Sequence, residues 1–266
     1  TATLTLIGIG DYSGTQDKTF TIVPATITVT PDDGQDKAFG APDPVLTYTF
    51  SDAANGQTPV ITGALSRVQG ENVGTYAFTL GTLALADGVG DNAAFKAANY
   101  TLALATYEEP AVAPTFEITA KPASTFTIAD IAERAYTGLA HMPAPEVKDG
   151  DTVLVKDRDY TLSYADNTNA GIATVTVTGS GDYSGSINTT FAITKATITV
   201  TPDAGQLKVK GSTDPVLTYA ATGAVNDETP AFTGALARAA GEDAGTYAIT
   251  QGTLALTNDG AFLSAN

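Results

Sequence analysis

Few residues in this sequence have the types and spacing that catalysis needs. The single histidine, His141, lies in an apolar stretch, and the chain contains no cysteine. A catalytic histidine requires a nucleophile or a carboxylate that the fold holds beside it. No cysteine or second histidine is present to complete such a pair. We therefore predict that His141 is an exposed loop residue and that the protein is not an enzyme.

Acidic turns are the best candidates for a bound ion. Segment 87–92 places two aspartates and an asparagine in a glycine-rich turn, and further acidic turns lie at 149–151 and 157–159. Calcium prefers carboxylate and amide oxygens, but none of these segments has the spacing of an EF-hand loop. We expect ordinary turns, with calcium as the alternative, and we assign no catalytic, cofactor-binding or metal-binding residues.

Charge and composition exclude several classes of partner. The chain carries 29 acidic and 13 basic residues, a net charge of −16. Nucleic acids and anionic lipids need a basic surface. The lysines and arginines here are scattered, so we expect no nucleic-acid partner. Because no apolar run reaches about 18 residues, we also expect no membrane insertion in this segment.

The elements that position these residues are predicted to be strands. Apolar and polar residues alternate strictly in segments 26–30 and 173–177, as they do in half-buried strands. Ile27 and Val29 should therefore face a core, with the threonines between them facing water. Turn signals recur at intervals of about 8–12 residues, which predicts an all-β protein made of antiparallel sandwiches.

The whole pattern returns once along the chain at a constant offset. Gly10-Asp11-Tyr12-Ser13-Gly14 recurs at 181–185, and segments 24–85 and 195–256 are identical at 39 of 62 positions without a gap. Copied modules of this kind are typical of structural arrays, whereas a catalytic pocket is rarely duplicated in this way. The repeat therefore predicts an architecture of copied modules in series.

A second repetition divides this unit into two domain types. The pattern Thr-Phe-x-Ile recurs at Phe20, Phe116 and Phe191, and we interpret each as the last strand of a domain. Four parts are predicted: 1–23, the C-terminal strands of a truncated type A domain; 24–121, a type B domain; 122–194, a type A domain; and 195–266, a type B domain that lacks its last two strands. The junctions contain no flexible Gly/Ser spacer, which predicts domains arranged end to end in an extended rod.

The unfinished last domain has two explanations. Segments 99–104 and 115–118 have no counterparts within 195–266. We favour a segment cut from a longer polymer of repeats. The alternative is a subunit whose last sandwich accepts a strand from a neighbour. The strands of residues 1–23 are of type A and would be poor substitutes for the missing type B strands.

Several motifs resemble domains of bacterial surface proteins. Segment 242–249, Glu-Asp-Ala-Gly-Thr-Tyr-Ala-Ile, looks like the Asp-x-Gly-x-Tyr start of strand F in immunoglobulin sandwiches. This resemblance implies that the hydroxyl of Tyr247 fixes a corner between loop and strand. The first copy has Asn72 where the second has Asp243.

The type B domains resemble MBG-type repeats. The residues that carry the resemblance lie at 196–200, 202, 214–219, 234–238 and 245–249. Phe39-Gly40 fits a subtype with an aromatic residue before a glycine, and Lys210-Gly211 departs from it. The type A domain is similar to immunoglobulin-like repeats of bacterial cell-surface proteins, through 135–138, 147–150 and 179–185 among others.

These resemblances imply tandem immunoglobulin-like domains at a bacterial cell surface. We predict a non-catalytic repeat region that forms a stalk or an extracellular filament segment of an adhesin-like protein, without a cofactor. Its partners would be neighbouring repeats of the same chain or fibre. The alternative is a module that binds a glycan or a protein through loops at one end of a domain.

Overall fold

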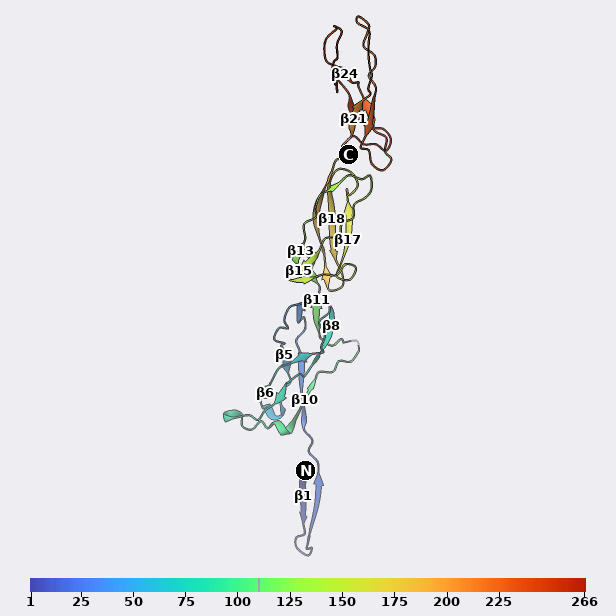
Figure 1. Cartoon of the computed structure of the whole chain (residues 1–266). Coiled ribbons are helices and arrows are strands. Elements are labelled where there is room, and N and C mark those ends of the chain that lie inside the picture. The colour runs from blue at the N-terminus through green and yellow to red at the C-terminus, as the bar shows by residue number, and fades with distance from the viewer. Residues whose placement is uncertain (110) are drawn as a thin grey trace. The chain divides into compact units, whose positions relative to one another are not determined.

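The computed structural model of the chain describes residues 1–109 and 111–266. The protein is predominantly β, with 40% of its residues in strands and 5% in helices. The chain divides into two units, Thr1–Lys121 and Pro122–Asn266, which are described in turn (Figure 1). Within the described residues, no helix is both long and apolar enough to cross a membrane.

The first unit begins with an isolated hairpin. Strands β1 (Ala2–Ile7) and β2 (Thr15–Phe20) pair antiparallel, with Ala2 opposite Phe20. Leu4 is 57% exposed and Phe20 is 58% exposed. The same register recurs in the second copy, where the counterparts Val175 and Phe191 are buried. Residues 1–23 thus have the same strand register as the hairpin of 171–194, with exposed apolar side chains.

Residues 24–121 contain two main sheets. The first has the order β10 (Tyr100–Leu104), β3 (Ala25–Pro31), β5 (Tyr48–Phe50), and the second has the order β4 (Asp36–Ala38), β11 (Thr115–Thr119), β8 (Gly74–Thr79), β7 (Ser66–Arg67). A small sheet pairs β6 (Ile61–Thr62) with β9 (Ala84–Leu85). Short 3-10 turns complete the unit: η1 (Ala54–Gly56), η2 (Gly90–Asn92) and η3 (Ala97–Asn99).

The core of this unit is filled from both main sheets. Val29 from β3 packs in one cluster with Phe116 and Ile118 from β11, and all three are fully buried. The predicted alternation in β3 is confirmed, since Ile27 is also fully buried whereas Thr26 is exposed. At residues 115–118, Thr-Phe-x-Ile is thus part of a strand whose two apolar side chains enter the core.

The expectation of purely antiparallel sheets is wrong for three pairs of described strands. Strand β10 runs parallel to β3, and β11 runs parallel to β4. In the second unit, β14 (Arg134–Ala135) runs parallel to β20 (Ser186–Thr194). In each case a strand from the beginning of a domain lies beside one from its end. Two such strands are not joined by a hairpin, so nothing forces them to run in opposite directions.

Residues 122–194 form the first part of the second unit. One sheet has the order β13 (Phe126–Ile128), β15 (Val147–Asp149), β16 (Thr152–Val153), and the other has the order β14, β20, β18 (Gly171–Gly179), β17 (Tyr160–Ala165). Strand β12 (Lys121–Pro122) spans the boundary between the units, and η4 (Ala123–Thr125) and β19 (Tyr183–Ser184) complete this part. Val175 and Phe191 lie in its central cluster, which explains why this hairpin is buried where β1 and β2 are not.

Residues 195–266 contain three two-stranded sheets. The pairs are β21 (Thr199–Pro202) with β22 (Tyr219–Thr222), β23 (Ala231–Thr233) with β26 (Ala255–Thr257), and β24 (Ala237–Arg238) with β25 (Ile249–Thr250). These strands correspond to β3, β5, β6, β9, β7 and β8. In 24–121, β10 extends the sheet of β3 and β5, and β11 joins β8 and β7 to β4. Residues 195–266 contain no counterparts of these two strands.

One copied motif has a steric explanation. In Thr62-Gly63-Ala64-Leu65, Gly63 adopts a φ of +84°, and a Cβ atom there would lie 2.1 Å from the carbonyl oxygen of Thr82. The copy, Gly234, has a φ of +75° and the same close approach to Thr253. Both the backbone conformation and the available space therefore require glycine.

Candidate functional site

Four charged residues form the most distinctive polar site of residues 24–121. Lys37 comes from β4 and Arg67 from β7, and both side chains are buried. Lys37 Nζ lies 2.7 Å from Asp43 Oδ1, and Lys37 also pairs with Glu71. Arg67 donates to both carboxylates, with Nε–Asp43 Oδ2 and Nη2–Glu71 Oε1 distances of 2.8 Å. We call this group the charge cluster.

Aromatic rings complete the surroundings of Arg67. Its guanidinium carbon lies 5.0 Å from the ring centre of Tyr76 and 5.0 Å from that of Phe116, a cation–π arrangement with each ring. Arg67 Nη1 also donates to the backbone carbonyls of Val68 and Gly70. The buried cation is therefore fully hydrogen-bonded, as a buried charge must be if it is not to destabilise the fold.

The charge cluster keeps its members ionised. Hydrogen bonds from Arg67, and then from Lys37, lower the pKa of Asp43 to about 2, although burial acts in the opposite direction. Lys37 and Arg67 likewise lower the pKa of Glu71. Hydrogen bonds to Asp43 and Glu71 raise the pKa of Lys37. All four groups are therefore charged at neutral pH.

This ionisation decides what chemistry the cluster can do. A lysine between two carboxyl groups has the composition needed to form an internal amide, with loss of water. That reaction needs a neutral amine and a protonated carboxyl group. Arg67 holds Asp43 as a carboxylate, and both carboxylates hold Lys37 as an ammonium. The arrangement is thus suited to fixing two loops against the sheet.

The same cluster recurs in the second copy. Lys208, Asp214, Arg238 and Glu242 replace the four residues one for one, with Lys208 Nζ–Asp214 Oδ1 at 2.7 Å and Arg238 Nη2–Glu242 Oε1 at 2.6 Å. Arg238 lies over one ring only, Tyr247, because 195–266 holds no counterpart of Phe116. Its side chain is 16% exposed, against 5% for Arg67.

The sequence interpretation did not identify these eight residues as a site. The signal that could have identified them is that the same four residue types, Lys, Asp, Arg and Glu, stand at equivalent positions of both copies. The sequence alone does not show that they meet, since up to 34 positions separate the members that form a bond.

The predicted tyrosine corner is confirmed in both copies. The hydroxyl of Tyr247 donates to the carbonyl of Asp243 at 2.8 Å, and that of Tyr76 donates to the carbonyl of Asn72 at 2.7 Å. The acceptor is a backbone oxygen, so the change from aspartate to asparagine leaves the bond unaffected. The corner places each tyrosine ring against the arginine of its charge cluster.

The acidic turns have structural partners. Asp87 accepts a hydrogen bond from the backbone N–H of Ala97 at 2.9 Å, which lowers its pKa, and Asn92 donates to the carbonyl of Thr58. Asp159 accepts from the N–H of Val155 at 2.8 Å. The described residues contain no group of three or more histidine, cysteine, aspartate or glutamate side chains arranged to hold a metal. Calcium binding at these turns is still only a prediction.

His141 is less exposed than expected. It is half-buried, and its backbone N–H donates to the carbonyl of Asn167 at 2.8 Å while the amide of Asn167 donates back to the carbonyl of His141. Its ring nitrogen Nε2 lies 3.5 Å from the hydroxyl of Thr137. His141 lies in a loop as expected, but the expectation of an exposed residue is wrong, because one backbone–backbone hydrogen bond and one from the side-chain amide of Asn167 hold the loop against 166–168.

Within the second unit, 122–194 and 195–266 meet at a packed joint. The hydroxyl of Tyr136 donates to the carboxylate of Glu228, which raises the pKa of the tyrosine. Asn266 accepts from the backbone N–H of Ala170 at 3.0 Å through its side chain and from that of Ala196 at 2.7 Å through its carbonyl. Val225 packs against the core cluster of 122–194. The joint is thus built from specific contacts on both sides.

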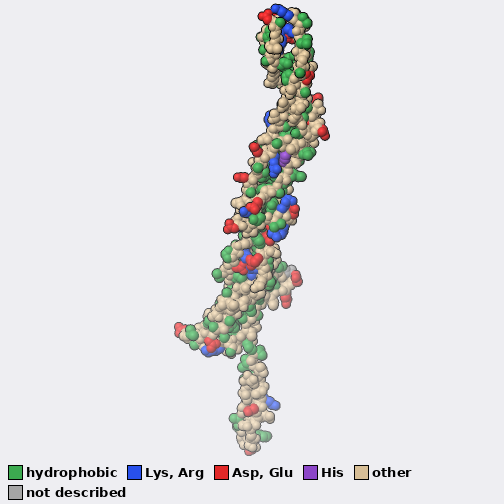
Figure 2. All heavy atoms as spheres, in the orientation of Figure 1, with side chains coloured by type: hydrophobic (Ala, Val, Ile, Leu, Met, Phe, Trp, Pro, Cys, Tyr) green, Lys and Arg blue, Asp and Glu red, His purple; other side chains and the backbone are tan. Residues whose placement is uncertain are grey.

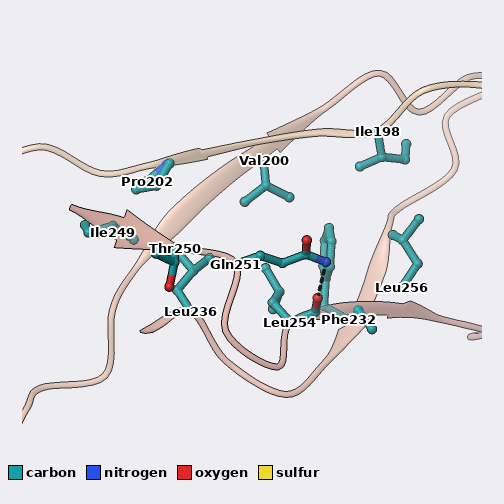
Figure 3. Close-up of a pocket in the computed structure, with 11 residues that line it drawn as sticks. Ile198, Val200, Pro202, Phe232, Leu236, Ile249, Thr250, Gln251, Leu254 and Leu256 are labelled. Carbon is teal, nitrogen blue, oxygen red and sulfur yellow. Dashed lines mark hydrogen bonds between the residues drawn. The ribbon is translucent and has the colours of Figure 1, made fainter. Parts of the chain in front are cut away.

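An apolar groove opens in residues 195–266. It has a volume of about 420 Å³ and is lined by Val200, Leu236, Ile249, Leu254 and other apolar side chains. Figure 3 shows Ile198 and Val200 on one side of the space, facing Leu236, Leu254 and Phe232 on the other. The side chain of Gln251 donates to the carbonyl of Leu254 at 2.9 Å and lies along the groove. Among the described residues no charged side chain lines it, but Thr250 and Gln251 add polar groups to its wall.

Comparison with protein families identifies the family to which both type B segments belong. A family model described as the MBG domain (YGX type) matches residues 27–107 and 198–258, together more than half of the chain. The second region matches although Lys210-Gly211 replaces the aromatic–glycine pair of Phe39-Gly40. No curated protein and no solved structure matches the chain. The chain therefore belongs to the MBG domain family of the YGX type.

Proposed function

We propose that this chain is a non-catalytic load-bearing segment of a bacterial surface protein. Its immunoglobulin-like domains would follow one another in an extended stalk or extracellular filament that holds an adhesin-like function away from the cell. Membership of a repeat-domain family and the copied pair of domains support a structural role. The partners would be neighbouring repeats of the same chain or fibre.

One observation carries this proposal: strands from the two ends of each complete domain lie side by side and run parallel. In 24–121, β3 pairs with β10 over five residues, and β4 pairs with β11 over three. In 122–194, Arg134 and Ala135 of β14 lie opposite Ile193 and Thr194 of β20. Tension along the chain pulls such strands past each other. Their hydrogen bonds are then loaded together and not one after another.

The packed joint of the second unit supports the same role. The contacts of Tyr136 with Glu228 and of Ala170 with Asn266 join 122–194 directly to 195–266. Two domains that share hydrogen bonds and a core residue resist bending better than domains on a flexible linker. Such a joint transmits force and orientation along a stalk.

Solution scattering tests the proposal. We expect a recombinant protein made of several copies of the A–B domain pair to scatter as a thin, extended particle whose maximum dimension grows linearly with copy number. A compact particle would contradict a stalk. Saturable binding to a glycan array at a domain-end loop would favour the alternative of a binding module.

A further inference from the structure

A proline follows the aspartate of each charge cluster. The sequence contains the dipeptide Asp-Pro at two places, 43–44 and 214–215, and each time the aspartate pairs with the lysine of its cluster. The two residues before the dipeptide differ between the copies, since Ala41-Pro42 corresponds to Ser212-Thr213, whereas the dipeptide and the two residues after it return unchanged. The combination of Asp-Pro with the cluster is therefore a retained feature of both copies.

An Asp-Pro peptide bond can be broken by the side chain of its own aspartate. A carboxylate oxygen attacks the carbonyl carbon of the same residue, which forms a five-membered cyclic anhydride. The bond from that carbon to the proline nitrogen breaks, and the nitrogen takes a proton from the acidic solvent. Proline leaves readily because its nitrogen is more basic than that of other peptide bonds. Water then opens the anhydride, so the two fragments together contain one molecule of water more than the intact chain.

The charge cluster holds both oxygens of the attacking group. Arg67 Nε donates to Asp43 Oδ2 and Arg67 Nη2 donates to Asp43 Oδ1, each at 2.8 Å, and Lys37 Nζ lies 2.7 Å from Oδ1. The two cations belong to different strands, β7 and β4, whereas Asp43 lies in the loop between β4 and β5. An oxygen that turns towards the carbonyl carbon of Asp43 must give up at least one charge-assisted hydrogen bond. The cluster therefore opposes the rotation that the attack needs.

The charge of Asp43 does not protect the bond. Hydrogen bonds from Arg67, and then from Lys37, lower the pKa of Asp43 to about 2. The carboxylate, which is the attacking form, thus persists in mild acid. Glu71, the fourth charged group of the cluster, pairs with both cations and helps to fix them. Protection must therefore come from the position in which the two oxygens of Asp43 are held.

We propose that the bond between Asp43 and Pro44 is a latent self-cleavage site, and that Arg67 together with Lys37 is the latch that keeps it intact in mild acid. Breaking the cluster opens the latch, and the chain is then cut between β4 and β5. The corresponding aspartate, Asp214, is contacted by Lys208 and Arg238. The inference concerns the chemistry of one bond and does not rest on the load-bearing role proposed above.

A cut at this bond would divide one domain between two fragments. Strands β3 and β4 would belong to residues 1–43, whereas their partners β10, β5 and β11 would belong to residues 44–266. Only hydrogen bonds and side-chain packing would then join the fragments. The latch therefore preserves the covalent continuity of the chain.

Mass spectrometry of the full chain tests the proposal. The parent protein and Arg67→Gln are incubated at pH 4, and fragments 1–43 and 44–266 are measured over time. We expect the variant to be cut about tenfold faster, because its barrier no longer includes the loss of a charge-assisted hydrogen bond. The parent protein unfolded in urea at the same pH gives the rate of the unrestrained bond, which should be at least that of the variant.

Three controls separate the latch from a general loss of folding. Val29→Ala removes core packing from the same domain at a residue outside the charge cluster, and it should be cut as slowly as the parent protein. Arg67→Gln combined with Pro44→Ala lacks the proline leaving group and should not be cut at this position. The bond between residues 214 and 215 should be cut at the same rate in the parent protein and in Arg67→Gln.

Three results would overturn the proposal. The first is cleavage of the folded parent protein at 43–44 as fast as in urea, a result that needs no variant. The second is equal acceleration by Val29→Ala and Arg67→Gln, which would mean that opening of the whole domain exposes the bond. The third is an unchanged rate in Arg67→Gln when circular dichroism at pH 4 shows that this variant is folded.

Discussion

At the scale of single residues, the charge cluster gives four of the few charged residues in 24–121 a structural role. Lys37 and Arg67 lie in short strands, whereas Asp43 and Glu71 lie in loops. Removing one member of a buried, hydrogen-bonded charge group leaves the others without partners, which is destabilising. The cluster therefore ties two loops to the sheet, and its retention in both copies follows from that role.

The depressed pKa of Asp43 predicts a loss of stability in acid. A carboxylate with a folded-state pKa of about 2 contributes stability above its ordinary pKa, and this contribution is lost as the pH falls from about 4 towards 2. The side chain of Asp43 is 41% exposed. Solvent screening therefore reduces the expected contribution to about 1 kcal/mol. Urea unfolding of residues 24–121, followed by hydrogen exchange between pH 2 and pH 6, measures it.

Asp43→Asn is the matched control for this effect. The variant keeps the size of the side chain but cannot be protonated in this range, so its stability should change less between pH 4 and pH 2 than that of the parent protein. If both proteins lose stability equally over this interval, Asp43 is not the group responsible.

At the scale of elements, the parallel strand pairs decide how each domain responds to tension. Strands β3 and β11 carry the ends of the domain 24–121, and each has a parallel neighbour, β10 and β4 respectively. A hairpin such as β7–β8 instead has antiparallel partners, Ser66 opposite Thr79. Force across opposed hairpin residues opens hydrogen bonds one at a time. Force along parallel strands loads all the hydrogen bonds between them at the same time.

Pulling direction therefore predicts mechanical resistance. We expect the unfolding force to be higher when residues 24–121 are held at Ala25 and Thr119 than when they are held at Ser66 and Thr79. The chain contains no cysteine, so cysteine pairs at these positions provide unique attachment points for single-molecule force spectroscopy. Equal unfolding forces in the two geometries would contradict a load-bearing arrangement.

At the scale of the whole molecule, the negative charge spread along the chain affects how its segments can contact one another. Figure 2 shows acidic side chains scattered over the visible surface, and the net charge is −16. A net charge of this size makes identical copies repel one another. Contacts between successive domains must therefore come from specific groups, as they do in the second unit at Tyr136, Gly138 and Asn266.

The joint predicts coupled motion of 122–194 and 195–266. Tyr136→Phe removes the hydrogen bond to Glu228, worth about 1 kcal/mol, without changing the buried ring. Residual dipolar couplings of the two segments should fit a single alignment tensor in the parent protein and require two in the variant. The control is Tyr164→Phe, which loses a hydroxyl bond to Pro143 within 122–194. An identical response of the two variants would show that the Tyr136 bond does not hold the joint.

Local patterns explain what could be predicted from the sequence. Alternation identified Ile27 and Val29 as core residues, and the motif around Tyr247 identified a corner whose hydroxyl bond is present. Both features depend on residues close together in the chain. The charge cluster and the groove depend on residues tens of positions apart. The sequence showed that their members recur but could not show that they meet.

The sequence by itself determined the repeat, the β character and the family, because period, alternation and motif are properties of neighbouring residues. Only the tertiary structure decided that the end strands run parallel and that Arg67 lies over the rings of Tyr76 and Phe116. The physical reason is that strand pairing and burial depend on contacts between distant segments.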